Sequence, residues 1–242
     1  RSRMVIAEQG RVPGFMDLKM TKGILYYTDN RCDENVWRAV QRRLESIGLP
    51  IISVSLKPIN FGKNIVFDGE RSRLTMFKQI LAGLENGKSD IVFFAEHDVL
   101  YHPSHFEFMP SGKDKFYYNE NRWRVDLKTG QALFYYCPST SGLCAYRDLL
   151  VTYYRGRIAR IEKEGYDHKE GYEPGLKTGA LETWISEYPN IDVRHGRNLT
   201  QSRWKQEDFK DKNTCLGWKM ANEVPGWGVT KGRFRDILKE IK

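Results

Sequence analysis

The first half of the chain alternates two patterns of apolar residues. Short apolar runs at 24–28, 51–55 and 91–95 predict buried β-strands. Between these runs, apolar residues recur at helical spacing and predict helices over 34–47 and 70–85. The order strand, helix, strand, helix, strand indicates a right-handed parallel α/β unit. In such sheets ligands bind beyond the carboxyl ends of the strands.

The second half of the chain is less regular. Aromatic runs on both sides of Lys128-Thr129-Gly130 predict an antiparallel hairpin within 116–136. Residues 1–21 contain Pro13-Gly14, which breaks regular structure, and are expected to form an N-terminal arm. The remaining elements that the pattern predicts are a helix at 147–163, a short helix at 180–187, a short strand at 191–193 and a closing helix at 233–241.

Composition and charge narrow the class of protein. Apolar residues make up 40% and charged residues 29% of the 242 residues, as in folded globular proteins. The formal charge of +8 favours anionic partners such as nucleotides, nucleic acid or envelope polymers, although a solvated basic surface would look the same. The four cysteines lie far apart without a C-x-x-C pair, which argues against a zinc knuckle and predicts reduced thiols in a cytoplasmic protein. No run approaches the ~18 apolar residues of a membrane span.

The strongest chemical signal is an acidic pair at the end of the third predicted strand. The apolar run 91–95 leads directly into Glu96-His97-Asp98. Residues at positions i and i+2 of a strand point to the same side, so both carboxylates are expected to face the ligand crevice. Two neighbouring buried carboxylates need compensation, and a divalent cation is the usual one. The alternative is an ordinary acidic turn that caps the next segment.

This strand and its acidic end, DIVFFAEHDVLYHP, resemble the Asp-x-Asp signature of GT-A glycosyltransferases. The resemblance covers roughly residues 22–200. It implies a Rossmann-like, mainly parallel mixed sheet flanked by helices, a nucleotide-diphosphate sugar as donor and Mn²⁺ or Mg²⁺ as cofactor. It also implies that Asp98 is the principal metal ligand and that Glu96 contacts the ribose or a metal-bound water. Glu96 stands where the signature has its first Asp, so this second role departs from the family pattern.

The resemblance assigns roles to further residues around the donor. Arginines at the start of a helix can hold phosphate, and small residues let the backbone approach a sugar closely. A solvated helix face and a simple strand-to-helix turn are the respective alternatives. The donor-binding residues implied are Thr28 and Asp29 at the base and ribose, Arg71 and Arg73 at the phosphates, and Ser141 and Gly142 under the sugar.

Three later segments complete the implied active site. Glu182, at the start of the predicted short helix, is the expected catalytic base, or alternatively only complements the helix dipole. His195 is the expected second metal ligand, although a lone His is often structural. Arg194 and Arg197 are expected to neutralise the leaving diphosphate. Spacing does not predict a zinc set from the other histidines near the acidic pair, His97, His102 and His105.

The predicted function is transfer of a hexose or N-acetylhexosamine, with a UDP-sugar as the expected donor. Residues 22–100 are assigned to the nucleotide and residues 101–242 to the acceptor. Trp123 and Tyr135 of the aromatic and basic hairpin are the expected acceptor contacts, and an anionic polymer such as modified DNA or an envelope glycan is one candidate acceptor. The alternatives are a non-catalytic nucleic-acid- or glycan-binding module and a metal-dependent nuclease or nucleotidyltransferase, which would need a second carboxylate cluster.

Overall fold

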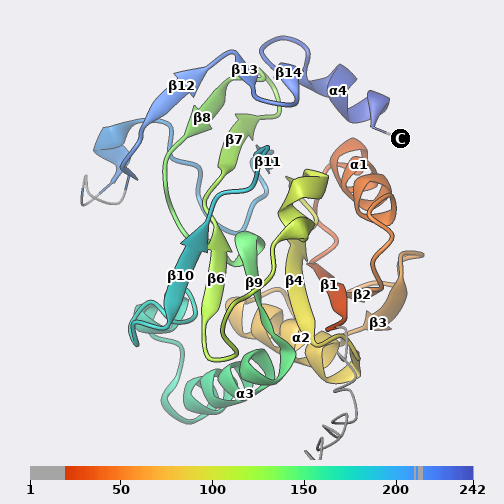
Figure 1. Ribbon diagram of the computed structural model, residues 1–242, viewed down its shortest axis with the longest axis vertical. Helices are drawn as coiled ribbons and strands as arrows, with labels where there is room; N and C mark the ends of the chain where they lie inside the picture. Colours follow the sequence, from red (N-terminus) through yellow and green to blue (C-terminus); the bar gives the residue numbers. More distant parts are fainter. Residues whose placement is uncertain (1–19, 210, 212–214, 242) are drawn as a thin grey trace, which may run out of the picture.

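A seven-stranded sheet forms the centre of the computed structural model, which describes residues 20–209, 211 and 215–241 (Figure 1). The strand order is β10-β6-β9-β4-β1-β2-β3, and only β9 runs antiparallel to its two neighbours β4 and β6. This mixed, mainly parallel sheet with flanking helices confirms the predicted GT-A-like α/β fold class. The strands are β1 (Lys22–Thr28), β2 (Ile51–Ser55), β3 (Lys63–Val66), β4 (Ile91–Glu96), β6 (Phe116–Asn119), β9 (Leu143–Tyr146) and β10 (Leu181–Trp184).

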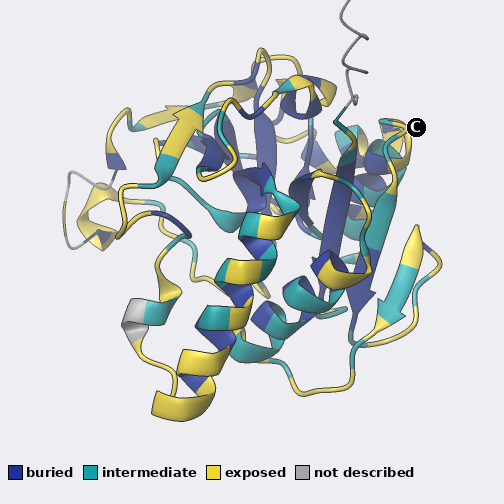
Figure 2. Cartoon of the chain, turned by 60° about the horizontal axis from the view of Figure 1, so that its bottom comes forward, coloured by how far each residue is buried: buried dark blue, intermediate teal, exposed yellow. Residues whose placement is uncertain are grey.

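Helices cover both faces of this sheet. Helix α2 (Arg73–Asn86) packs against α3 (Arg147–Glu164) on one face, and α1 (Glu34–Glu45) lies on the other beside α4 (Phe234–Glu240). Figure 2 shows buried strands in the interior and exposed residues on the outward faces of the helices. Short 3₁₀ turns occupy Pro103–Glu107, Thr140–Gly142, His168–Gly171 and Gln206–Asp208.

A second sheet lies above the first in the view of Figure 1. Its order is β12-β8-β7-β11-β5, and β7 and β8 form the antiparallel hairpin that the sequence predicted. A two-stranded ribbon, β13 (Glu223–Val224) with β14 (Gly228–Val229), follows it. The strands of the second sheet are β5 (Val99–Leu100), β7 (Arg122–Asp126), β8 (Ala132–Phe134), β11 (Asn190–Arg194) and β12 (Lys219–Ala221).

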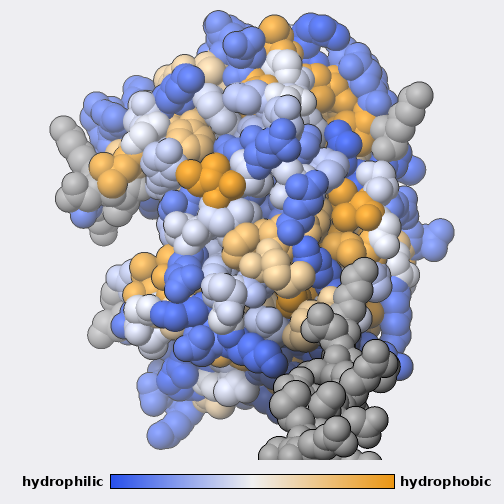
Figure 3. All heavy atoms as spheres, viewed as in Figure 1, coloured by the Kyte–Doolittle hydropathy of each residue, from blue (hydrophilic) through white to orange (hydrophobic). Residues whose placement is uncertain are grey.

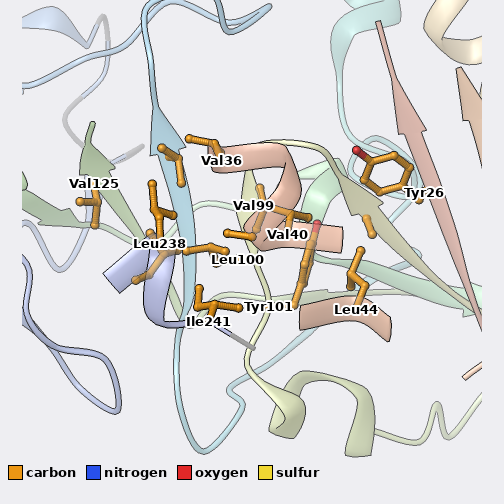
Figure 4. Packing of buried hydrophobic residues seen from close by; sticks show 14 of the residues in the cluster. Tyr26, Val36, Val40, Leu44, Val99, Leu100, Tyr101, Val125, Leu238 and Ile241 are labelled. Atoms are coloured by element: carbon orange, nitrogen blue, oxygen red, sulfur yellow. The ribbon is translucent and has the colours of Figure 1, made fainter. Parts of the chain in front are cut away.

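Strand alternation divides the apolar residues between two cores. Leu25 and Tyr27 of β1 point toward α2 and α3, whereas Ile24 and Tyr26 point toward α1 and the second sheet. The core on the α1 side contains side chains from β5, from other strands and from the helices α1 and α4, and Figure 4 shows part of it. The residues drawn there include Val36, Val40 and Leu44 of α1, Val99, Leu100 and Tyr101 around β5, and Leu238 and Ile241 near the C-terminus.

One predicted element is wrong, and several strands of the structure were not predicted. The predicted short helix at 180–187 is wrong, because residues 181–184 form β10, which pairs in parallel with β6 at the sheet edge. Residues 63–66, to which the sequence pattern assigns no element, form the edge strand β3, and β5, β9, β12, β13 and β14 were likewise not predicted. The predicted N-terminal arm falls almost entirely on residues 1–19, outside the described part of the chain.

The described helices lack the combination of length and apolar character that a bilayer crossing requires. Hydrophilic residues spread widely over the face seen in Figure 3, and hydrophobic residues lie between them in small groups.

Candidate active site at the carboxyl ends of β1 and β4

A cavity of about 400 Å³ lies where β1 and β4 end. This volume is within the range of small-molecule sites, roughly 300–1,000 Å³. Both carboxylates of the acidic pair line it, as strand alternation predicted. The second sheet supplies the opposite wall through Arg122 and Arg124 of β7. The cavity therefore lies at the crevice where α/β sheets bind ligands.

The end of β1 is fixed by a polar network. Asn30, with φ of 60°, adopts the left-handed conformation that Asn tolerates better than most residues. Its side-chain oxygen accepts hydrogen bonds from the backbone amides of Leu56 and Lys57, which ties β1 to the end of β2. Asp29 accepts a hydrogen bond of 2.5 Å from Nε of Arg71. Asp29 and Arg71 thus line the cavity as an ion pair before any ligand is considered.

Glu96 is the last residue of β4 and is held by two tyrosines. The Tyr27 hydroxyl donates to Oε1 of Glu96 at 2.5 Å, and the Tyr101 hydroxyl accepts from the Glu96 amide at 3.0 Å. Burial and the negative charge of Asp98 raise the pKa of Glu96 to about 8, although the Tyr27 hydrogen bond opposes this. A carboxyl group with such a pKa is largely protonated at neutral pH. Glu96 is therefore suited to hydrogen bonding rather than to charge pairing.

Asp98 has the opposite electrostatic character. Burial would raise its pKa, but His97, His195 and a hydrogen bond from Asn198 outweigh burial and lower it to about 2. The antiparallel pairing of β11 with β5 brings the end of β11 beside Asp98. Nε2 of His195 consequently lies 3.5 Å from Oδ2 of Asp98, and Nε2 of His97 lies 3.9 Å from the same oxygen. Asp98 is thus an ionised carboxylate next to two imidazoles.

These groups can hold a metal ion. The His195 side chain is only 1% exposed, yet neither of its ring nitrogens has a hydrogen-bond partner among the residues that the structure describes. A buried nitrogen without a partner is costly, by roughly 1–3 kcal/mol, and coordination to a cation would satisfy it. Cys32, His97 and His195 also cluster, since one donor atom of each lies within 4.8 Å of the other two. The residues present therefore fit a divalent cation beside Asp98.

Arginines dominate the remaining wall of the cavity. Seven of them line it, against five carboxylates, so the lining is positively charged before any cation binds. Arg122 pairs with Asp192 at 3.0 Å. Arg124 makes no ion pair with a described carboxylate; it donates to the Tyr135 carbonyl at 2.8 Å and lies 3.5 Å from the Tyr135 ring centroid. The seven are Arg71, Arg73, Arg122, Arg124, Arg157, Arg194 and Arg203.

Arg124 is the member of this wall best placed for an anionic ligand. Burial and the positive charge of Arg122 lower the pKa of Arg124 to about 10, which still leaves it charged at neutral pH. A buried guanidinium without a carboxylate partner favours an anion, and phosphate matches its planar array of donors. The cavity is therefore chemically suited to a polyanionic ligand such as a diphosphate.

Glu173 is a lining residue that the sequence interpretation missed. Its Oε2 accepts a hydrogen bond of 2.7 Å from the Thr140 hydroxyl, and burial raises its pKa. The turn that holds it requires glycine: Gly175 has φ of 83°, and a Cβ there would approach the Phe116 ring to 2.8 Å. The only signal in the sequence was an acidic residue directly before Pro174-Gly175 in a glycine-rich loop.

The structure places nine of the predicted site residues in the cavity wall and five outside it. Those in the wall are Thr28, Asp29, Arg71, Arg73, Glu96, Asp98, Tyr135, Ser141 and Arg194. His195 lies behind the wall against Asp98, and Gly142 is buried next to Ser141. Arg197 is exposed, and its carbonyl accepts a hydrogen bond from Arg71.

Two predicted residues lie away from the cavity. Glu182 is on the edge strand β10, where its side chain is 46% exposed and lies 3.8 Å from Lys115. Trp123 is buried in the core and contacts Phe134 at 5.4 Å between ring centroids. Strand alternation explains the second case: Arg122 and Arg124 face the cavity, so the residue between them faces the other way. The structure does not bring Glu182 or Trp123 together with the other predicted residues.

Comparison by sequence finds neither a matching protein-family model nor a matching curated protein. Among solved structures, one similar chain is a glycosyltransferase involved in glycosylation of the major capsid of PBCV-1 (10% identity, TM-score 0.45, covering 74% of this chain and 94% of that one). Another is a Drosophila β-1,4-galactosyltransferase 7 mutant with manganese, UDP-Gal and xylobiose (13%, 0.42, 78% and 79%). A third is an inositol-1-phosphate CTP transferase from T. maritima (10%, 0.43, 75% and 92%). At these identities and TM-scores the similarity does not bear on activity, which has to be inferred from the site.

Proposed function

We propose that this protein is a cation-dependent glycosyltransferase that moves a sugar from a nucleoside-diphosphate sugar to an acceptor hydroxyl. One observation carries the proposal. Asp98, in the turn after β4, and His195, just after β11, meet at 3.5 Å beside a cavity that is also lined by arginines. A bound cation and the arginines would together attract the negatively charged diphosphate of the donor. They would also neutralise the charge of the diphosphate as it leaves.

Each wall of the cavity has a separate task in this proposal. Thr28 and Asp29, at the end of β1, contact the nucleoside, and the Asp29–Arg71 pair orients the arginine toward the phosphates. Ser141 lies in the 3₁₀ turn before β9 and approaches the donor sugar. Arg124 and Arg194 stabilise negative charge on the leaving diphosphate. A divalent cation held by Asp98 and His195 supplies Lewis-acid neutralisation of the same charge when bound.

We assign the catalytic base to Glu173 in place of Glu182. A base must lie within hydrogen-bond reach of the acceptor hydroxyl, and only Glu173 of the two lines the cavity. Burial raises its pKa, which makes it a stronger proton acceptor than an ordinary carboxylate. The proton of the acceptor hydroxyl would pass to a Glu173 carboxylate oxygen as the hydroxyl attacks the anomeric carbon.

Release of nucleoside diphosphate from a panel of nucleotide sugars tests this function. Wild type should release the diphosphate from one or a few donors in the presence of a divalent cation, and Asp98→Asn should not. The matched control is Asp236→Asn, the same substitution on the exposed face of α4, which should behave like wild type. A panel with no cation-dependent release above the control without enzyme would contradict the proposal.

A further inference from the structure

We infer that the cation site of this protein is a thiolate–imidazole centre formed by Cys32, His97 and His195, and that its ion is zinc rather than manganese or magnesium. The inference deepens the proposed function, on which it rests for the role of Asp98 and His195. It also departs from the oxygen-rich site with Mn²⁺ or Mg²⁺ that the sequence resemblance implied.

Three separate parts of the fold bring the donors together. Cys32 lies in the loop between β1 and α1, His97 in the turn between β4 and β5, and His195 just after β11. One donor atom of each lies within 4.8 Å of the others. In a tetrahedral zinc site, bond lengths place such atoms roughly 3.4–3.6 Å apart. The donor atoms therefore have to come closer together to bind one ion.

The backbone around these residues is already fixed. The Cys32 thiol contacts the His97 carbonyl at 3.6 Å, which holds the cysteine loop against the β4–β5 turn. Asn198 accepts a hydrogen bond of 3.0 Å from the His195 amide and donates one of 2.9 Å to the Val193 carbonyl. Both contacts leave the imidazole rings free of hydrogen bonds. The thiol contact uses the Cys32 sulfur itself, so a metal ion would replace it with a metal–thiolate bond.

Unsatisfied nitrogens provide independent support. Within the described part of the chain, neither ring nitrogen of His195 has a hydrogen-bond partner, although its side chain is 99% buried; Nε2 has only the 3.5 Å contact with Asp98. Nδ1 of His97 is buried without a partner as well. Buried polar atoms are almost always hydrogen-bonded in folded proteins, so several unpartnered nitrogens in one cluster point to a missing ligand. A metal ion would accept an electron pair from one nitrogen of each imidazole in this cluster.

The donor types select the ion. Thiolate and imidazole are the ligands of zinc and other borderline or soft ions, whereas magnesium and manganese prefer oxygen. Three protein donors leave a tetrahedral ion one further position. Oδ2 of Asp98, at 3.5 Å from Nε2 of His195 and 3.9 Å from Nε2 of His97, is close enough to serve as a fourth donor. A diphosphate oxygen would then bind as a fifth ligand, a coordination number that zinc can adopt. His97 and Asp98 line the cavity, so the centre adjoins the proposed diphosphate site.

Cobalt titration of the chelator-treated full chain tests the inference. Co²⁺ replaces zinc in such sites, and a bound thiolate gives a charge-transfer absorption in the near ultraviolet. Wild type should develop this band with one equivalent of Co²⁺, and Zn²⁺ should abolish it while excess Mg²⁺ or Mn²⁺ should not. Cys32→Ser should lose the band. The matched control Cys137→Ser, which removes another half-buried thiol, should keep it.

A second measurement needs no variant and guards against misfolding of Cys32→Ser. Zn²⁺, but not Mg²⁺, should protect Cys32 of the wild type from alkylation by iodoacetamide, as read by mass spectrometry. Absence of the cobalt band, or equal competition by Mn²⁺, would overturn the inference. If nucleotide binding still required a cation in that case, the proposed function would survive. If the cobalt band appeared but no nucleotide bound, the metal centre would be supported and the proposed glycosyltransferase function would be contradicted.

Discussion

Asn198 donates a hydrogen bond of 2.7 Å from its side-chain amide to Oδ2 of Asp98, the carboxylate at the centre of the site. The side-chain oxygen Oδ1 of Asn198 accepts a hydrogen bond from the backbone amide of His195 at the same time. One side chain therefore sets the positions of both Asp98 and His195. Residues that orient metal ligands in this way typically matter nearly as much as the ligands themselves.

Replacing Asn198 with alanine should weaken cation-dependent nucleotide binding. The loss should be about 10- to 100-fold, because Asp98 and His195 would no longer be held in register. Isothermal titration of the nucleoside diphosphate, with thermal unfolding as a check on folding, measures this. An Asn198→Ala protein with wild-type affinity would show that the side chain only shapes the loop.

The Glu173→Gln substitution should separate catalysis from binding. Turnover should fall by ~10²–10⁴ while donor affinity stays close to wild type, since glutamine keeps the shape but cannot accept the proton. Glu182→Gln is the matched comparison and should have wild-type turnover, because Glu182 lies on the exposed sheet edge. The reverse pattern, with only Glu182→Gln inactive, would restore the assignment made from the sequence.

Trp123→Ala should act on stability rather than on the acceptor. Trp123 is 5% exposed and packs in the core, so truncation should lower the free energy of unfolding by about 3–5 kcal/mol. Urea denaturation gives this value, and the KM for the acceptor measured on the folded fraction should change little. A large rise in that KM with unchanged stability would return Trp123 to the acceptor site.

Glu96 should make stability depend on pH. Its folded pKa of about 8 lies above the usual value of about 4.3, so the folded protein binds the proton more tightly than the unfolded chain. The contribution of Glu96 to the free energy of unfolding is therefore fully present below about pH 4 and is lost as the pH rises toward about 8. In EDTA, the free energy of unfolding of wild type relative to Glu96→Gln should fall by up to ~1.4 kcal/mol per pH unit over this range. Parallel pH profiles for the two proteins would contradict the assignment.

Local patterns were sufficient to predict the strands β1, β2 and β4 and the helices α1, α2 and α3. The run 91–95 predicted β4 because a fully buried strand needs apolar residues on both faces, and helical spacing in 34–47 located α1 within two residues. The segment 181–184 could not be predicted as a strand, because its structure depends on parallel pairing with β6, far away in sequence. Four residues without clear alternation carry no local signal of that pairing.

The same distinction applies to the site. Asp98 was predictable as a site residue from the sequence, because a carboxylate at the end of a buried strand is expected at the ligand crevice. Cys32 was not, because its proximity to His97 exists only after β1 and β4 pair, which brings the loops that follow them together. Glu173 was hidden for a similar reason, since the loop 165–179 has no periodicity and its path depends on contacts such as Gly175 against Phe116.

Isothermal titration of UDP and GDP tests the central claim most directly, because binding is measured without knowledge of sugar or acceptor. The account predicts that wild type binds at least one of them when Zn²⁺ or Mn²⁺ is present, and that binding disappears in EDTA and in Asp98→Ala. Asp236→Asn should bind like wild type. Equal affinity with and without EDTA, or unchanged affinity in Asp98→Ala, would contradict a cation-dependent diphosphate site at Asp98.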